Sequence, residues 1–416
     1  MNESLAHITV LDLSRILAGP WATQLLADLG ADVIKIERPG AGDDTRAFGP
    51  PFVGATGGSD AGARGTAASR GDAAYFLCAN RNKKSVTVDF TKPEGQALVR
   101  RLAASADVVL ENFKVDGLKA YGLDYASLKA LNPKLIYCSI TGFGQSGPYA
   151  ARPGYDFLIQ AMGGLMSVTG RRGDEPGSGP QKTGVAVADI MTGLYATVGI
   201  LAALTHRERT GEGQYIDVSL LDTQVACLAN QAMNYLVSGE VPQPMGNAHP
   251  SIVPYQDLPT RDGFMALAVG NDTQFARLCT EMGLAELAQD PRFSTNPERV
   301  RHRTVLIEQL CAVSLTRSTA DWVNVLQAAG VPCGPINHID AVFADPQVQA
   351  RGMRVDMAHP VAGTVSLVAN PLRLSQTPVS YRLAPPTLGA HTREVLKDRL
   401  GLGDTDIDAL TAKRII

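Results

Sequence analysis

The sequence predicts an α/β protein in which helices cover both faces of a parallel sheet. Strand and helix patterns alternate along residues 8–140, and such alternation is typical of parallel sheets. A second, smaller α/β pattern follows at residues 260–330. A chain of 416 residues is also long enough for two or three domains.

The first strand–helix–strand unit is marked by its end residues. Residues 8–13 and 32–37 are apolar enough for buried strands, and residues 21–29 fit a helix. Pro20 suits the first turn of that helix, and Gly30 suits its end.

The remaining elements follow the same pattern. Strands are expected at 85–90, 107–112 and 135–140, and helices at 93–105 and 125–132. Residues 189–238 are expected to be helical throughout, and residues 53–72, rich in Gly, Ala and Ser, to form a mobile surface loop. In the smaller unit we expect a strand at 263–269 and helices near 272–282, 303–315 and 319–329, before a tail of strands and loops from about 331.

The composition is that of an ordinary globular protein. It is 45% hydrophobic and 19% charged, with a formal net charge of −3, which argues against a nucleic-acid partner. The longest apolar run, Ile190 to Leu204, is shorter than a membrane span, and the first residues lack a signal pattern, so a cytoplasmic protein without a membrane partner is expected. The six cysteines form no Cys-x-x-Cys pair, so no metal site is expected.

One carboxylate, Asp189, stands at the start of a long apolar segment. No other charged residue lies between Lys182 and His206. A carboxylate at a helix N-terminus is stabilised by free backbone N–H groups, so Asp189 is expected to stay ionised and to be available as a nucleophile. The alternative is that Asp189 only caps the helix.

A nucleotide cofactor is the first functional alternative, because Glu37 ends the second strand. The turn before the first helix, Leu17 to Pro20, holds one glycine where a dinucleotide site needs three, and Pro20 lacks an N–H for a phosphate. No resident cofactor is therefore expected.

Five motifs together resemble the class III coenzyme A-transferases. They are residues 11–20 (LDLSRILAGP), 29–39 (LGADVIKIERP), 80–85 (NRNKKS), 109–113 (VLENF) and 210–217 (TGEGQYID). The likeness runs in motif order from about residue 6 to 396.

The resemblance implies a fold, partners and a reaction. It implies a Rossmann-like large domain formed by residues 1–220 and 331–416, with linker helices and a small inserted α/β domain at 221–330, in an intertwined homodimer. Its substrates would be an acyl-CoA and a carboxylic acid. Asp189 would be the nucleophile, forming an aspartyl anhydride and then an aspartyl-CoA thioester.

The resemblance also implies binding residues. CoA would contact Arg15, Ala18, Arg38, Lys83, Asn112 and Phe113, with Lys114 or Lys119 as candidates for its 3′-phosphate. Gly246 and Asn247 match a glycine loop that would stabilise an oxyanion. A substrate carboxylate needs a cation or several N–H donors, and we expect Arg46, Arg81, Tyr155 or His249 near it.

Several alternatives stay open. Residues 40–52, 220–227 and 246–255 look most like the succinyl-CoA:glutarate group of that family, but 3-sulfinopropionate, itaconate or a monocarboxylate are other candidate acids. The α-methylacyl-CoA racemases share the fold, but they have His where Gly154-Tyr155-Asp156 has Tyr155, which is a poor base near neutral pH with its ordinary pKa of about 10. A catalytically silent CoA-binding subunit is the last alternative.

Overall fold

The computed structural model describes residues 3–53 and 71–416, so the loop expected to be mobile at 53–72 lies almost entirely outside the described residues. The chain divides into two compact units. The large unit comprises Met1–Leu165, Thr183–Ala232 and Gln349–Ile416, and the small unit comprises Met166–Lys182 and Met233–Val348.

These boundaries differ from the expected ones in three segments. Residues 221–232 belong to the large unit, whereas 166–182 and 331–348 belong to the small unit. Hydrogen bonds explain two of the differences: the strand at Cys333–Pro335 pairs within the small unit's sheet, and the Gly246 N–H donates to the Gly170 carbonyl.

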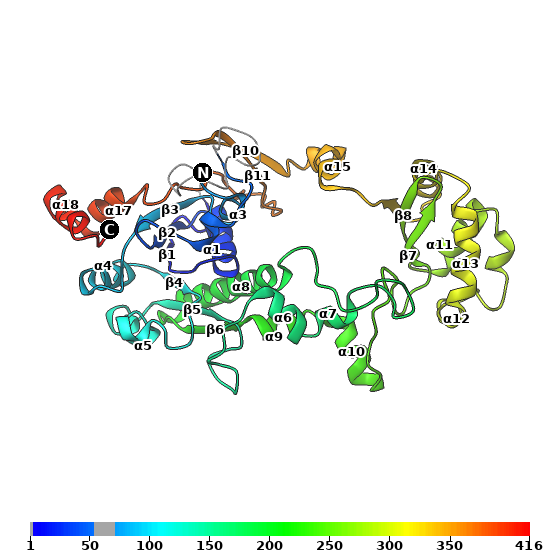
Figure 1. Cartoon of the computed structure of the whole chain (residues 1–416), viewed down its shortest axis with the longest axis horizontal. Helices are drawn as coiled ribbons and strands as arrows, with labels where there is room; N and C mark the ends of the chain where they lie inside the picture. Colours follow the sequence, from blue (N-terminus) through cyan, green and yellow to red (C-terminus); the bar gives the residue numbers. More distant parts are fainter. Residues whose placement is uncertain (1–2, 54–70) are drawn as a thin grey trace. The chain divides into compact units, whose positions relative to one another are not determined.

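A six-stranded sheet forms the centre of the large unit, with strand order β3-β2-β1-β4-β5-β6 and parallel pairing throughout (Figure 1). The strands are β1 (Thr9–Asp12), β2 (Asp32–Glu37), β3 (Lys83–Thr87), β4 (Val108–Glu111), β5 (Ile136–Thr141) and β6 (Tyr215–Ser219). The chain order reverses between β1 and β4, which lie side by side although β2 and β3 come between them in the sequence. In open α/β sheets such a reversal opens a crevice at the carboxyl ends of the strands.

Two apolar cores cover the two faces of this sheet, because successive strand residues point to opposite sides. Val10 packs with α1 (Ala18–Asp28) and α8 (Val187–Thr210), whereas its neighbour Leu11 packs with α4 (Pro93–Ala104), α5 (Tyr125–Leu131) and α17 (Thr392–Leu400). The other helices of this unit are α3 (Ala74–Leu77), α6 (Asp156–Met162), α9 (Leu220–Ala226) and α18 (Asp404–Ala412), with α7 (Leu165–Val168) and α10 (Ala229–Ser238) at its boundary.

The C-terminal segment returns to the large unit, as expected. It forms the hairpin of β10 (Arg354–His359) and β11 (Gly363–Val368), and then runs along β3. The Asn82 N–H donates to the Leu383 carbonyl, and the His391 N–H donates to the Ser85 carbonyl. Segments from both ends of the sequence therefore build one domain.

The stretch expected to be helical at 189–238 contains a strand, so that prediction was wrong. Gly211 ends α8 in a left-handed conformation with φ 79°, and the chain then extends into β6 alongside β5. The expectation that no segment reaches membrane length was also wrong for α8. This helix has 24 residues, and an 18-residue stretch of it has a mean hydropathy of 1.7, enough to cross a membrane by length and composition. Here it packs on α1, α9, β5 and β6 as a core helix.

The small unit matches the expected pattern closely. Its antiparallel sheet has the order β7 (Tyr255–Thr260), β8 (Gly263–Ala268) and β9 (Cys333–Pro335). Its helices are α11 (Asp272–Glu281), α12 (Asn296–Arg301), α13 (Arg303–Ser314), α14 (Thr319–Ala328) and α15 (Ile339–Ala344), and α16 (Pro346–Ala350) spans the boundary between the two units. The buried Trp322 and Phe275 lie in its apolar core.

Candidate active site

A cavity of about 370 Å³ lies in the large unit, at the reversal of strand order. It is lined by the segments that follow β1, β4 and β5, together with the start of α8. Seven of the expected site residues line it: Arg15, Ala18, Asn112, Phe113, Lys114, Tyr155 and Asp189. The fold thus brings these residues together from four separate stretches of sequence.

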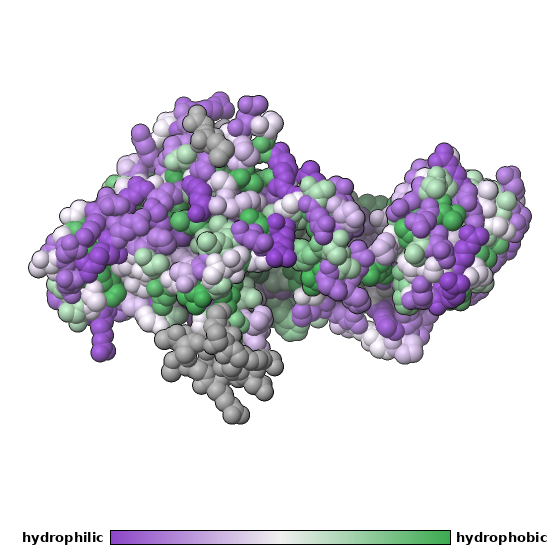
Figure 2. Space-filling view, turned by 90° about the horizontal axis from the view of Figure 1, so that it is seen from above, coloured by the Kyte–Doolittle hydropathy of each residue, from purple (hydrophilic) through white to green (hydrophobic). Residues whose placement is uncertain are grey.

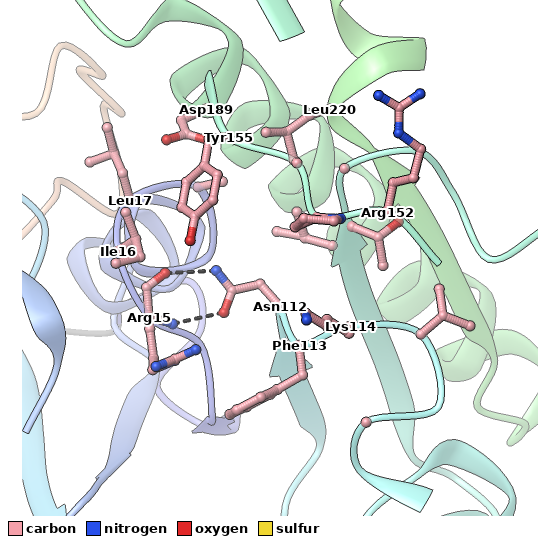
Figure 3. A pocket seen from close by; sticks show the side chains of 18 of the residues that line it. Arg15, Ile16, Leu17, Asn112, Phe113, Lys114, Arg152, Tyr155, Asp189 and Leu220 are labelled. Carbon is pink, nitrogen blue, oxygen red and sulfur yellow. Dashed lines mark hydrogen bonds between the residues drawn. The ribbon is translucent and has the colours of Figure 1, made fainter. Parts of the chain in front are cut away.

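Asn112 holds two walls of this cavity together. Its Oδ1 accepts the Arg15 N–H at 2.8 Å, and its Nδ2 donates to the Arg15 carbonyl at 2.6 Å, as Figure 3 shows. Ile16, next in the chain, takes a left-handed φ of 69°. The loop after β1 is therefore shaped by a side chain from the end of β4.

Asp189 occupies the third helical position of α8, two residues after the first, so it does not cap the helix. Its residue is 9% exposed, and its side chain faces the cavity from one end (Figure 3). Among the described residues, no hydrogen bond or ion pair reaches its carboxylate. Such a buried and unpaired carboxylate is a usable nucleophile.

Asp156, on α6, caps α8 in its place. Its Oδ1 accepts the Ala188 N–H at 2.8 Å and the Asp189 N–H at 3.3 Å. Burial, followed by the charge of Asp156, raises the pKa of Asp189 from 3.8 to about 7. The expectation that the helix end keeps Asp189 ionised is thereby corrected, because Asp156 takes the N–H groups that would have stabilised it.

Arg15, Arg38 and Tyr155 differ in their exposure and in their position relative to the cavity. The guanidinium of Arg15 is 5.3 Å from the centre of the Phe113 ring and pairs with Asp44 at 2.9 Å. Arg38 is exposed and does not line the cavity. Tyr155 is 67% exposed, with its ring at the same cavity as Asp189.

Three cations that we expected at the site are buried in ion pairs, which corrects their assignment. Lys83, 0% exposed, donates to Asp12, the Pro20 carbonyl and Asn80, and burial lowers its pKa to about 8. Arg46 pairs with Glu37 and Asp72, and Arg81 pairs with Asp28. These side chains hold strands and loops together, and none lines the cavity.

The predicted glycine loop lies in the small unit. Gly246 has φ 63° and forms a turn with Asn247, with nothing within 4 Å of where a Cβ would stand. The Nδ1 of His249 accepts the Ser251 N–H at 3.0 Å, and its ring packs on Tyr255. The roles of these three residues stay predictions.

Sequence reasoning missed two groups near Asp189. Arg152 lines the cavity and stacks on Tyr149 and Phe143, with ring distances of 4.5 and 5.3 Å. On α3, burial and the charge of Asp189 raise the pKa of Tyr75 to about 12. Arg152 directly precedes the Pro-Gly-Tyr-Asp stretch at 153–156, which was the signal available for it.

Comparisons with known proteins identify the family of this chain. The family described as CoA-transferase family III matches residues 5–392. A succinate–glutarate CoA-transferase of Agrobacterium fabrum is 53% identical over 394 residues, covering 95% of both chains. A succinyl-CoA:glutarate CoA-transferase of Mus musculus is 43% identical, covering 100% of this chain and 90% of the relative. A CAIB/BAIF family protein from Brucella suis superposes with a TM-score of 0.83 at 50% identity, covering 96% of this chain and 100% of that structure.

The family match and the relatives thus define the class of this α/β protein as the CoA-transferases. The chain is a member of CoA-transferase family III. The resemblance drawn from the five motifs is confirmed.

Proposed function

We propose that this enzyme moves CoA from succinyl-CoA to a short dicarboxylate such as glutarate. The names of the relatives from Agrobacterium fabrum and Mus musculus both pair succinate or succinyl-CoA with glutarate. The observation that carries the proposal is Asp189, whose carboxylate has no hydrogen-bond or ion-pair partner among the described residues. It faces a cavity of about 370 Å³ at the switch point of the sheet.

The proposed reaction runs through two covalent adducts on Asp189. A carboxylate oxygen attacks the thioester carbonyl, the C–S bond breaks, and CoA leaves as a thiolate from a mixed anhydride. The thiolate then attacks the aspartyl carbonyl, which releases succinate and leaves an aspartyl-CoA thioester. The acceptor carboxylate repeats these steps in reverse. Each oxyanion needs N–H donors, a role we propose for the turn at Gly246 and Asn247.

The residues proposed for CoA are those that line the cavity. Ala18 would lie beside the thioester, and Asn112 and Phe113 would contact the pantetheine and adenine parts. Arg15, Lys114 and the exposed Arg38 supply cations for phosphate groups. Lys83 is excluded from this role by its burial.

Arg152 is the cation that we propose for the distal carboxylate of the acid, in place of the buried Arg46 and Arg81. It lines the same cavity as Asp189, aromatic rings hold its guanidinium, and among the described residues it has no ion pair with a carboxylate. Arginine matches the planar geometry of a carboxylate.

Replacement of Arg152 by glutamine should raise the KM for glutarate by about 10-fold or more, because a charge-assisted hydrogen bond is lost. The KM for succinyl-CoA should stay unchanged. Steady-state kinetics with each acid checks this, with R171Q, at an exposed arginine outside the cavity, as the control. An equal rise in the KM for succinyl-CoA with every acceptor would assign Arg152 to the CoA phosphates instead.

The function itself is tested by a transfer assay read by mass spectrometry. Purified enzyme is mixed with succinyl-CoA and with one acid at a time: glutarate, 3-sulfinopropionate, itaconate, malate, adipate, acetate or carnitine. New CoA esters of one or two dicarboxylate-like acids, without esters of acetate or carnitine, would support the proposal. If no acid gives an ester, the substrate assignment fails, and α-proton exchange on a 2-methylacyl-CoA would test the racemase alternative.

We also propose that the enzyme is an intertwined homodimer with the small unit as an inserted domain, active in the cytoplasm without a resident cofactor. Large apolar side chains are exposed on α8 and α10, including Val198 at 63% and Leu236 at 70%. Apolar patches are visible on the face drawn in Figure 2. Such exposed patches are typical of interfaces between chains, and light scattering of the purified protein gives the oligomeric state directly.

A further inference from the structure

Two carboxylates meet at the start of α8, and only one of them has hydrogen-bond donors. Asp156 accepts the Ala188 and Asp189 N–H groups on Oδ1 and the Gln160 side chain on Oδ2, the last at 2.6 Å. The Asp189 carboxylate belongs to the same residue whose backbone N–H donates to Asp156, and it has no such donor among the described residues. The charge of Asp156 is therefore well stabilised, whereas that of Asp189 is not.

A buried glutamine keeps Asp156 in this orientation. Gln160 is 0% exposed, and its Oε1 accepts the Thr183 N–H at 2.9 Å and the Thr183 hydroxyl at 3.2 Å. This links α6 to the segment that leads into α8. Asp156 cannot turn away from the helix end without breaking hydrogen bonds at both of its oxygens.

Among the described residues, no cation forms an ion pair with Asp156 or Asp189, and the other charged groups around the start of α8 have partners of their own or are exposed. On α1, Asp28 is paired with Arg81, and on β6, Asp217 accepts the Gln145 N–H. Asp222 of α9 is exposed to solvent. On β5, burial raises the pKa of the Tyr137 phenol and of the Cys138 thiol, so both groups stay neutral. Burial raises the pKa of Tyr75 of α3 to about 12, so this phenol is neutral near neutral pH. At the cavity, Arg15 is paired with Asp44, and Arg152 is held over aromatic rings.

We propose that Asp156 is a positioning residue whose fixed negative charge destabilises the ionised carboxylate of Asp189 and thereby favours its conversion into acyl adducts. This inference rests on the proposed function, in which Asp189 is the nucleophile. In the anhydride, a new C–O bond has formed and the negative charge has left with the CoA thiolate. In the thioester, a C–S bond has formed and the charge has left with succinate. Asp189 is uncharged in both adducts, so both relieve the repulsion from Asp156.

The proposal predicts a pH dependence with a definite sign. Only ionised Asp189 attacks, and its pKa of about 7 means that activity falls as the pH drops through 7. Without the charge of Asp156, the pKa of Asp189 moves down towards its ordinary value, so activity should persist to lower pH. The adducts should then be less favoured, because the ionised state from which they form is more stable.

The test is Asp156→Asn, which keeps an acceptor for the helix N–H groups but removes the charge. We expect the pH midpoint of kcat/KM for succinyl-CoA to fall by about one unit, and the fraction of Asp189 held as CoA thioester to fall about tenfold. Intact-mass spectrometry after mixing with succinyl-CoA without an acceptor measures that fraction. Asp156→Glu, which keeps the charge, should restore both values.

Asp222→Asn is the matched control, because it removes one carboxylate charge at an exposed position of α9 that has no role in the site. It should leave the pH midpoint and the thioester fraction unchanged. If Asp156→Asn does not fold, Asp156→Ser, an uncharged cap residue, replaces it. An unchanged midpoint and thioester fraction in a folded uncharged variant would overturn the inference. A wild-type enzyme that forms no adduct on Asp189 would instead overturn the proposed function.

Discussion

Replacing Asp189 with alanine should reduce CoA transfer by about 10³-fold or more, because both proposed covalent adducts form on its carboxylate. The fold should survive, since the carboxylate makes no hydrogen bond or ion pair among the described residues and Asp156 caps α8 in its place. The transfer assay with succinyl-CoA and glutarate measures the loss, and the unfolding midpoint reports the fold.

A matched control separates this loss from a general effect of removing a carboxylate. Asp222→Ala, at an exposed aspartate of α9, should keep the wild-type rate. Hydroxylamine added during turnover should convert only Asp189 into a hydroxamate, detectable in a peptide digest. Substantial turnover by a folded Asp189→Ala variant would rule out this residue as the nucleophile.

Replacing Arg81 with methionine should destabilise the protein by about 3–5 kcal/mol, because it leaves the buried Asp28 carboxylate without its partner. Arg81 is 4% exposed and donates to Asp28 at 2.9 and 2.6 Å and to the Val368 carbonyl at 2.8 Å. It thus joins α1, the start of β3 and the C-terminal hairpin. Urea unfolding measures the loss.

Arg393→Met is the comparison variant, since Arg393 makes exposed ion pairs with Asp404 and Asp408 and should show no measurable loss. The folded fraction of the Arg81 variant should keep the wild-type KM for glutarate. A raised KM with unchanged stability would return Arg81 to the substrate site, where the sequence had placed it.

The regular elements of this fold were largely predictable from local patterns. The strand at 32–37 was predicted at its observed bounds, and α11, α13 and α14 lie within a residue or two of their predicted bounds. β6 was missed because its apolar residues come shortly after the long apolar helix α8 and look like its continuation. Its strand conformation is decided by pairing with β5. The small-unit boundaries were missed for a similar reason, since β9 pairs with β8, a strand that lies much earlier in the sequence.

For the site, the sequence indicated several residues that line the cavity, but it did not show how the charged ones are paired. Asn112 and Phe113 do line the cavity with Asp189, but Lys83, Arg46 and Arg81 are neutralised by carboxylates distant in sequence. A basic residue in a motif looks the same whether it faces a ligand or a buried aspartate. Only the packing of the chain distinguishes the two.

The sequence by itself determined the class of enzyme, the parallel sheet and the identity of Asp189 as the candidate nucleophile. Tertiary structure alone decided the state of that carboxylate. A pKa depends on burial and on charges within a few ångströms, and Asp156, 33 residues earlier in the chain, reaches the helix end only after α6 has packed against α8. Local sequence patterns do not show that Asp156 and Asp189 are close in space, so the electrostatics of the site can be read only from the tertiary structure.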